Sequence, residues 1–188
     1  MTARLQLDVV SIRVVTADAV PGLPAVALRC DRFPVLDFGI GDQVTVLTDS
    51  WEYECCGDLL TIGDQGRFTV AAAEGLMHVH HGPGGTPIDG YATHHDVGDT
   101  PDVTCVGVVT GLWECFCSLR RDLADDSTWE RVLASGQSYA VDRIERFPHR
   151  ADEQEWNAKT RLRPTVFDAW LTQFRVLEIL PTPGRSAR

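Results

Sequence analysis

Two stretches of the sequence share one pattern: Ile40-Gly-Asp-Gln-Val-Thr-Val-Leu47 and Ile62-Gly-Asp-Gln-Gly-Arg-Phe-Thr-Val70. In each, a Gly-Asp pair precedes residues in which apolar and polar side chains alternate. Glycine tolerates a positive φ and aspartate binds nearby backbone amides, so the pair predicts a turn. Alternation with a period of two predicts a strand with one buried face. Both stretches therefore predict turns that lead into β-strands, and turn chemistry explains the repeat better than a duplicated module does.

Alternating segments of the same kind occur on both sides of these stretches. They comprise Leu5–Thr16, Ala25–Phe33, Val103–Val109, Leu112–Leu119 and Ser138–Phe147. One short helix is expected at 127–136, because Ser127 and Glu130 form a capping box and Gly136 occupies a C-cap position. Residues 165–180 fit a helix or a closing strand, and we expect a short helical turn followed by a strand. Seven or eight short strands with one short helix predict a mainly β protein, either a small barrel or a sandwich.

A long Gly/His-rich loop separates the two groups of strands. Residues 75–102 hold six glycines, three prolines and five histidines, and so many backbone breakers exclude a long regular element. Loops of this length in compact domains are usually functional or disordered. We therefore expect a single β-rich domain over residues 1–188, with a division into 1–75 and 103–181 joined by loop 76–102 as the alternative.

The composition limits the partners and the location of the protein. The 188 residues include 27 acidic and 17 basic side chains, and the net charge of −10 repels a phosphate backbone. No window approaches the roughly 18–20 apolar residues that span a bilayer, and Gln6 and Asp8 interrupt the apolar run that a signal peptide needs. We therefore expect a cytoplasmic protein with reduced thiols that binds neither nucleic acid nor a membrane.

The strongest functional signal is a concentration of metal-binding side chains. Ten of the twelve cysteines and histidines lie between Cys55 and Cys117. Structural zinc is bound by four Cys or His ligands in a tetrahedral arrangement. The expected metal ligands are Cys55 and Cys56 from one turn, Cys117 from a strand, and His80 or His81 from the loop. Metal–ligand bonds would offset the entropy that is lost when a glycine-rich loop is ordered.

Several neighbouring side chains are alternative ligands. Any of His78, His94, His95 and Cys115 could replace one of the expected ligands. The other two cysteines, Cys30 and Cys105, are expected to be small buried core residues. The spacing differs from that of zinc-finger knuckles, so it does not identify the ion or decide between these ligands.

Two functions follow from such a site. The preferred one is a non-enzymatic β module, stabilised by zinc, that binds a protein or small-molecule partner through its loop. The alternative is a small metalloenzyme with an open metal position that activates water. In that enzyme Asp96, Asp99 or Glu54 would act as the general base.

Other functions have less support in the sequence. A thiol-redox protein would use Cys55 with Cys56, or Cys115 with Cys117, but no Cys-x-x-Cys motif is present. A cupin-type metal site needs a glutamate soon after its His-x-His pair, whereas glycines and a proline follow His81. Neither a Gly-x-Ser-x-Gly elbow nor a phosphate-binding Gly-Lys-Ser/Thr sequence occurs. A metal-free binding protein with core cysteines is the remaining alternative.

The double-cysteine turn also carries a resemblance. The motif Trp51-x-x-x-Cys55-Cys56-Gly57 is followed by Ile62-Gly63-Asp64, by His80-His81-Gly82 and by Gly107-Val108-Val109. Over residues 40–120 the chain resembles an uncharacterised family of bacterial proteins with a Trp-x-x-x-Cys-Cys-Gly turn followed by a hydrophobic-Gly-Asp strand start. That family is a domain of unknown function, so the resemblance implies no activity.

Overall fold

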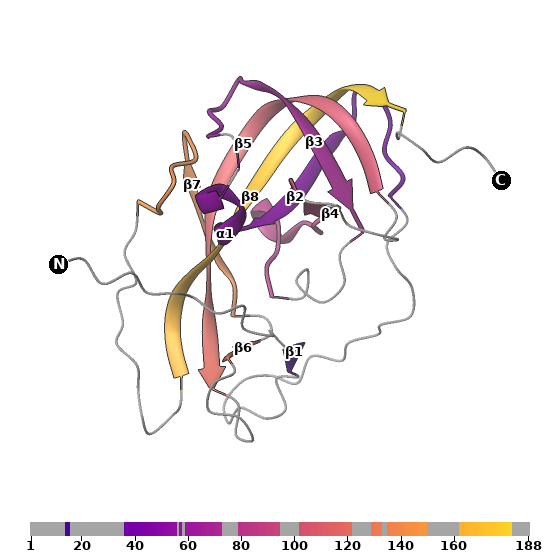
Figure 1. Ribbon diagram of the computed structural model, residues 1–188. Helices are drawn as coiled ribbons and strands as arrows, with labels where there is room; N and C mark the ends of the chain where they lie inside the picture. Colours follow the sequence, from indigo (N-terminus) through magenta and orange to yellow (C-terminus); the bar gives the residue numbers. More distant parts are fainter. Residues whose placement is uncertain are drawn as a thin grey trace.

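The computed structural model describes residues 14–15, 36–55, 57, 59–72, 79–94, 102–121, 129–132, 135–149 and 162–181. In chain order the elements are β1 Val14–Val15, β2 Gln43–Asp49, α1 Ser50–Cys55, β3 Gln65–Ala71, the 3-10 turn η3 Pro83–Gly85, β4 Gly90–Ala92, β5 Asp102–Arg121, β6 Trp129–Val132, β7 Gln137–Val141 and β8 Leu162–Leu180. The prediction of a mainly β protein with one short helix is confirmed (Figure 1).

Five strands close into a barrel. Their order is β5–β3–β4–β2–β8, and β8 pairs back with β5. All of these pairs are antiparallel except β2 with β4, which is parallel. Strands from both sides of the Gly/His-rich segment thus belong to one sheet. Closure leaves no unpaired edge within this ring of strands, which distinguishes a barrel from a sandwich.

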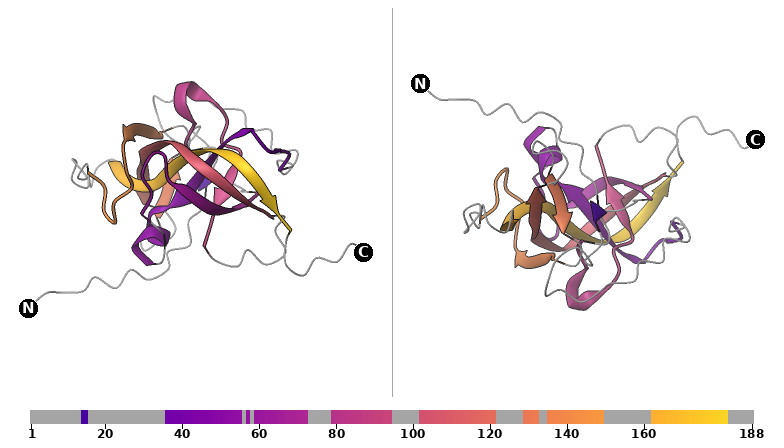
Figure 2. Two further views of the ribbon diagram at one scale, coloured as in Figure 1. Left: turned by 90° about the horizontal axis from the view of Figure 1, so that it is seen from above. Right: turned by 90° about the horizontal axis from the view of Figure 1, so that it is seen from below.

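The two longest strands form a ribbon that extends beyond the barrel. β5 and β8 pair from Thr104 with Leu180 to Arg120 with Leu162, with four irregularities in register. At the far end of the ribbon β6 pairs with β5, and β1 pairs with β6. Figure 1 shows this end below the barrel, and both views in Figure 2 show β5 and β8 side by side. The ribbon therefore provides a second surface, outside the barrel, on which other segments pack.

The two predicted Gly-Asp turns are present. Gly41 and Gly63 have φ angles of 96° and 98°, in the left-handed region that glycine tolerates best. The carboxylates of Asp42 and Asp64 each accept a hydrogen bond from the backbone amide three residues earlier, at 2.7 and 2.8 Å. β2 and β3 follow these turns directly. The repeated pattern is thus explained by local turn chemistry.

Aromatic side chains fill the interior of the barrel. The rings of Phe68 and Phe174 stack with centroids 4.1 Å apart, and Trp170 is fully buried near them. Gly107 allows this packing, because a Cβ atom there would lie 2.5 Å from Cδ2 of Phe174. Smaller clusters pack on other parts of the sheet, one of them around Cys115 and another around Cys117.

The helix expected at 127–136 is wrong. Trp129–Val132 is strand β6, in which Arg131 pairs with Leu119 of β5. A capping pattern expresses only a local preference, and pairing with the long ribbon overrides it. The short helix is instead α1, which directly follows β2.

The helical turn expected at the start of residues 165–180 is also wrong. This segment belongs to a single strand, β8. Of the two expected N-terminal strands, only Val14–Val15 lies in the described part of the chain, and 25–33 lies outside it. Within the Gly/His-rich segment, η3 and β4 are three residues long each. The described helices are too short or too polar to cross a membrane.

Candidate metal centre

Three buried side chains from distant parts of the sequence converge on the ribbon. The ligand atoms of His80, Cys117 and Asp168 all lie within 4.8 Å of one another. The residues are 2%, 1% and 8% exposed. They offer one nitrogen, one sulfur and one oxygen ligand. Within the described residues, no other cluster of three or more such side chains has this geometry.

A break in strand register positions Asp168. Cys115 pairs with Ala169 and Phe116 pairs with Phe167, so Asp168 has no partner on β5. An unpaired extra residue of this kind is a β-bulge, which redirects a side chain and bends the strand. The bulge brings the Asp168 carboxylate within 4.8 Å of the Cys117 sulfur.

A close backbone approach positions His80. The amide of Gly136 donates a hydrogen bond to the carbonyl of Val79 at 3.1 Å. A Cβ atom at Gly136 would lie 2.3 Å from that carbonyl oxygen and 2.6 Å from Nδ1 of His80. Only glycine fits at this distance, because side-chain atoms essentially never approach so closely. Gly136 therefore holds the histidine segment against the ribbon and does not end a helix.

The Asp168 carboxylate is the centre of a buried polar network. Its Oδ2 lies 2.7 Å from Nε2 of His80, and its Oδ1 accepts a hydrogen bond of 2.6 Å from Nε of Arg131. Nη2 of Arg131 also donates to Oδ1 of Asp49, at 3.1 Å. A positive guanidinium thus bridges two carboxylates, one on β8 and one at the end of β2.

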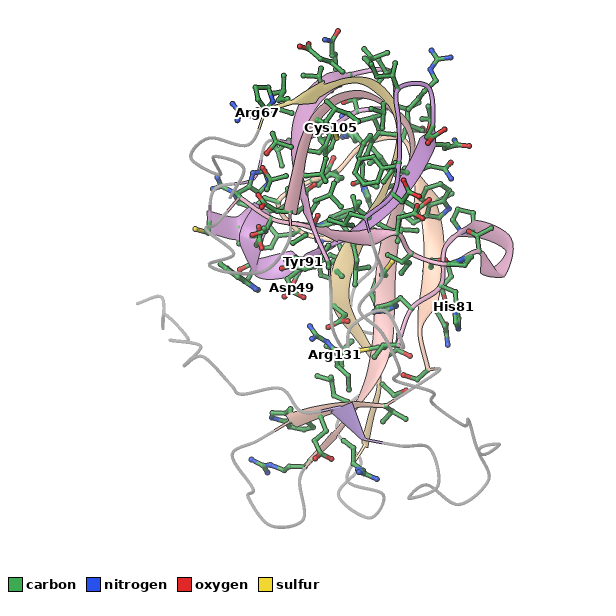
Figure 3. All side chains as sticks on the ribbon, turned by 90° about the vertical axis from the view of Figure 1, so that its right-hand side faces the viewer. Asp49, Arg67, His81, Tyr91, Cys105 and Arg131 are labelled. Carbon is green, nitrogen blue, oxygen red and sulfur yellow. The ribbon has the colours of Figure 1, made fainter. Side chains whose placement is uncertain are left out.

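The network continues along the side of the barrel. The Tyr91 hydroxyl lies 3.1 Å from Oδ2 of Asp49 and 2.8 Å from Oε1 of Glu52. The other oxygen of Glu52 accepts a hydrogen bond from the backbone amide of His94. In Figure 3, Tyr91 and Asp49 lie beside each other, and Arg131, on β6, lies below them. Hydrogen bonds therefore link the metal-ligand cluster to α1 and to the end of β4.

Burial and neighbouring charges change the acidity of the cluster. Burial acts to raise the pKa of Asp168, but the hydrogen bond with His80 and the charge of Arg131 outweigh it and hold this pKa below its ordinary value. Burial, together with the negative charge of Asp168, raises the pKa of the Cys117 thiol far above its ordinary value. Burial likewise raises the pKa of Asp49, and Arg131 opposes that effect. The Asp168 carboxylate thus carries the negative charge that attracts a cation. The Cys117 thiol becomes a ligand only when metal binding displaces its proton.

This arrangement suits metal binding better than thiol chemistry. A nucleophilic cysteine needs a base that removes its proton and a low pKa. Here the Cys117 thiol is buried beside the negative charge of Asp168, and both raise its pKa. One thiolate, one carboxylate and one neutral imidazole together carry two negative charges, which balance a divalent cation. Nitrogen, sulfur and oxygen ligands of these types are those that zinc accepts.

The structure brings together two of the predicted ligands, His80 and Cys117. Cys55 is exposed at the end of α1 and His81 is exposed next to His80, and neither joins the described cluster. Cys56 lies outside the described residues. The thiol of Cys55 therefore has no described partner for a shared metal site.

The alternative ligands and general bases include buried residues, exposed residues and residues outside the described part of the chain. Cys115 is buried two residues before Cys117, while His94 and Glu54 are exposed near the barrel. His78, His95, Asp96 and Asp99 lie outside the described residues, and so does Cys30. The expectation that Cys105 is a core residue agrees with its complete burial inside the barrel.

Sequence reasoning missed Asp168. It lies within Val166-Phe-Asp-Ala-Trp-Leu171, where it is the one charged side chain among apolar residues. A charged group in such a run must be paired when it is buried, so this position was a signal for a polar partner. Arg131 was missed for the related reason that its segment was interpreted as a helix.

The buried Cys105 predicts a loss of stability at alkaline pH. Burial raises its pKa to about 11, from 9.0 for an unperturbed thiol. The folded state holds this proton more tightly than the unfolded state does. The contribution of the Cys105 thiol to the free energy of unfolding is therefore complete below about pH 9, and it declines by up to about 2 kcal/mol as the pH rises toward 11. Urea unfolding at several pH values, with Cys105→Val as the comparison, measures this pH-dependent contribution to stability. Parallel stability curves for the two proteins above pH 9 would contradict the prediction.

Comparison with protein families matches residues 42–166 to a family of unknown function, DUF6578. The matched range runs from the turn before β2 into β8, and it includes His80 and Cys117 but ends before Asp168. Comparisons with curated proteins and with solved structures find no match.

Proposed function

The chain belongs to DUF6578, a family of unknown function, and from the geometry of the site we propose that it is a metal-stabilised β-barrel module with a structural zinc site. The described part of the chain supplies three of the four ligands that such a site needs: His80, Cys117 and Asp168. One observation carries the proposal: three buried ligand atoms of different chemical types lie within 4.8 Å of one another.

The metal joins three parts of the chain that do not follow one another in sequence. His80 lies on the Gly/His-rich segment, Cys117 on β5 and Asp168 on β8. A bond from each to one ion fastens the histidine segment onto the ribbon. This offsets the entropy lost when a segment rich in glycine is ordered.

Arg131 supports the ion from outside its ligand shell. Its guanidinium binds Oδ1 of Asp168 and Oδ1 of Asp49. This leaves Oδ2 of Asp168, which faces Nε2 of His80, as the oxygen that would bind the cation. Partners of metal ligands commonly orient them in this way. The second carboxylate, Asp49, balances the guanidinium charge.

One observation favours a metalloenzyme as the second candidate. Catalytic zinc sites typically use three protein ligands and leave the fourth position to water, and the described cluster contains three ligands. The burial of all three supports the structural role instead, because a substrate needs access to the ion. Reversible binding of small anions to the metal-loaded protein, with the fold intact, would favour the enzyme.

In the cell the module acts as a binding protein in the cytoplasm. Reducing conditions there keep thiols available for metal. Its partner is a protein or a small molecule. The net charge of −10 makes nucleic acid an unfavourable partner.

The metal content of protein purified without added metal tests the proposal. We expect about one zinc per chain, and addition of zinc to the metal-free protein at 100 times its Kd should raise the free energy of unfolding by about 2.7 kcal/mol. Cobalt(II) in place of zinc should produce a thiolate-to-cobalt charge-transfer absorption.

Two cysteine variants identify the sulfur ligand. Cys117→Ser should abolish the cobalt charge-transfer absorption, whereas Cys55→Ser, at an exposed position outside the cluster, should retain it. Absence of both zinc and cobalt binding would refute the metal site. Loss of the absorption in Cys55→Ser alone would move the site to the double-cysteine turn.

A further inference from the structure

A small cavity lies apart from the metal-ligand cluster, between β3, β8 and the end of β4. Its volume is about 40 Å³, and its polar lining consists of Thr48, Arg67, Thr69, Thr93, His94 and Thr172. We propose that this cavity binds a short-chain organic carboxylate. The inference goes beyond the proposed function, because it needs no metal and uses none of the metal ligands.

The charge of the lining is the opposite of that of the protein. The chain has 27 acidic residues against 17 basic ones, yet none of the residues that line the cavity is acidic. Arg67 and His94 are exposed at its rim, and no ion pair within the described residues engages the Arg67 guanidinium. Figure 3 shows Arg67 at the outer edge of the barrel. An anion is therefore favoured at this position over a neutral or cationic ligand.

A buried hydroxyl provides the second, independent observation. Thr172 is 0% exposed, and its Oγ1 has no hydrogen-bond partner within the described part of the chain. Buried hydroxyls are nearly always paired, since leaving one unpaired destabilises the fold. A carboxylate contributes only acceptors, and it matches the hydroxyl and guanidinium donors of this lining.

The size of the cavity limits the ligand. A water molecule needs roughly 10–15 Å³ on the same measure, so a cavity of about 40 Å³ holds about three waters or a ligand of a few heavy atoms. Formate, acetate and propionate are in this range. Tyr53, Leu60 and Phe68 provide apolar walls for a short alkyl chain.

Titration of ¹⁵N-labelled protein with sodium propionate, followed by NMR at constant ionic strength, tests the proposal. We expect saturable shifts for residues of the cavity, and at least tenfold weaker binding of propionamide, which has the same shape without the charge. Equal binding of the amide, shifts that map elsewhere, or no saturation by about 100 mM, which is well above a Kd of 1 mM, would overturn the proposal.

Two variants separate binding from folding. Arg67→Gln, at an exposed position, should weaken propionate binding about tenfold, the loss expected of one charge-assisted hydrogen bond, and leave the urea midpoint unchanged. Thr172→Val removes the unpaired hydroxyl at nearly constant volume, so binding should weaken while the urea midpoint stays equal or rises. If both variants fold and bind propionate as the wild type does, the proposed site is wrong.

Discussion

Asp168→Ala is expected to destabilise the protein by about 3–5 kcal/mol, the range for breaking a buried ion pair. The carboxylate is 8% exposed and binds both His80 and Arg131, at 2.7 and 2.6 Å. Its removal leaves the Arg131 guanidinium buried with Asp49 as its only described carboxylate partner. Urea unfolding at neutral pH in the presence of a metal chelator measures this loss separately from any metal effect.

Two controls show whether the loss comes from the buried pair. Glu178→Ala removes an exposed carboxylate from the same strand and should change the free energy of unfolding by no more than about 0.5 kcal/mol. The double variant Asp168→Ala with Arg131→Met should be more stable than the sum of the single effects predicts, because it leaves no unpaired cation. A loss below about 1 kcal/mol for Asp168→Ala would contradict the description of the pair as buried and coupled.

Phe174→Ala is expected to destabilise the protein by about 3–5 kcal/mol, as is typical of a buried phenylalanine. Its ring is 0% exposed and stacks on Phe68 at 4.1 Å. It also fills the space over Gly107, on the strand that closes the barrel with β8. Truncation therefore leaves a cavity where β5 and β8 close the barrel. Calorimetry or urea unfolding measures the resulting loss of stability.

Leu177 provides the matched control for this prediction. It lies three residues farther along β8, at a register irregularity, and is 39% exposed. Leu177→Ala should cost clearly less than Phe174→Ala, since more than a third of the Leu177 surface stays in water and its truncation leaves no enclosed cavity. Similar losses for both variants would mean that Phe174 is not part of a closed core.

The metal-ligand cluster and the barrel core depend on the same strand. Asp168 and Phe174 are both on β8, the first where the ribbon leaves the barrel and the second inside it. The bulge at Asp168 changes which side of the strand faces the interior. This explains how one continuous strand supplies a carboxylate to a polar cluster and an aromatic ring to an apolar one.

The features that could be predicted from the sequence depend on adjacent residues or on residue type. The Gly-Asp turns at Gly41 and Gly63 were predictable because positive φ and side-chain capping depend on a few adjacent residues. The strands that follow them were predictable because alternation expresses a period of two. For His80 and Cys117, residue chemistry was sufficient to identify candidates, since imidazole and thiol groups are common metal ligands.

The predictions that were wrong concern segments whose secondary structure depends on pairing with distant strands. Residues 129–132 form a strand because they pair with β5, although their local signals favour a helix. Residues 165–180 form one strand because they pair with both β2 and β5. In each case, interstrand hydrogen bonds and burial outweigh a preference that amounts to a fraction of a kcal/mol per residue.

The amino-acid sequence by itself determined the β-rich class, the turns that start two barrel strands and the residue types able to hold a metal. Each of these depends on neighbours within a few positions along the chain. Closure of the barrel, the bulge that turns Asp168 inward and the meeting of that carboxylate with His80 and Cys117 were decided only by the tertiary structure. They depend on register and packing between distant segments, such as those of His80 and Asp168, 88 residues apart, which local patterns do not encode.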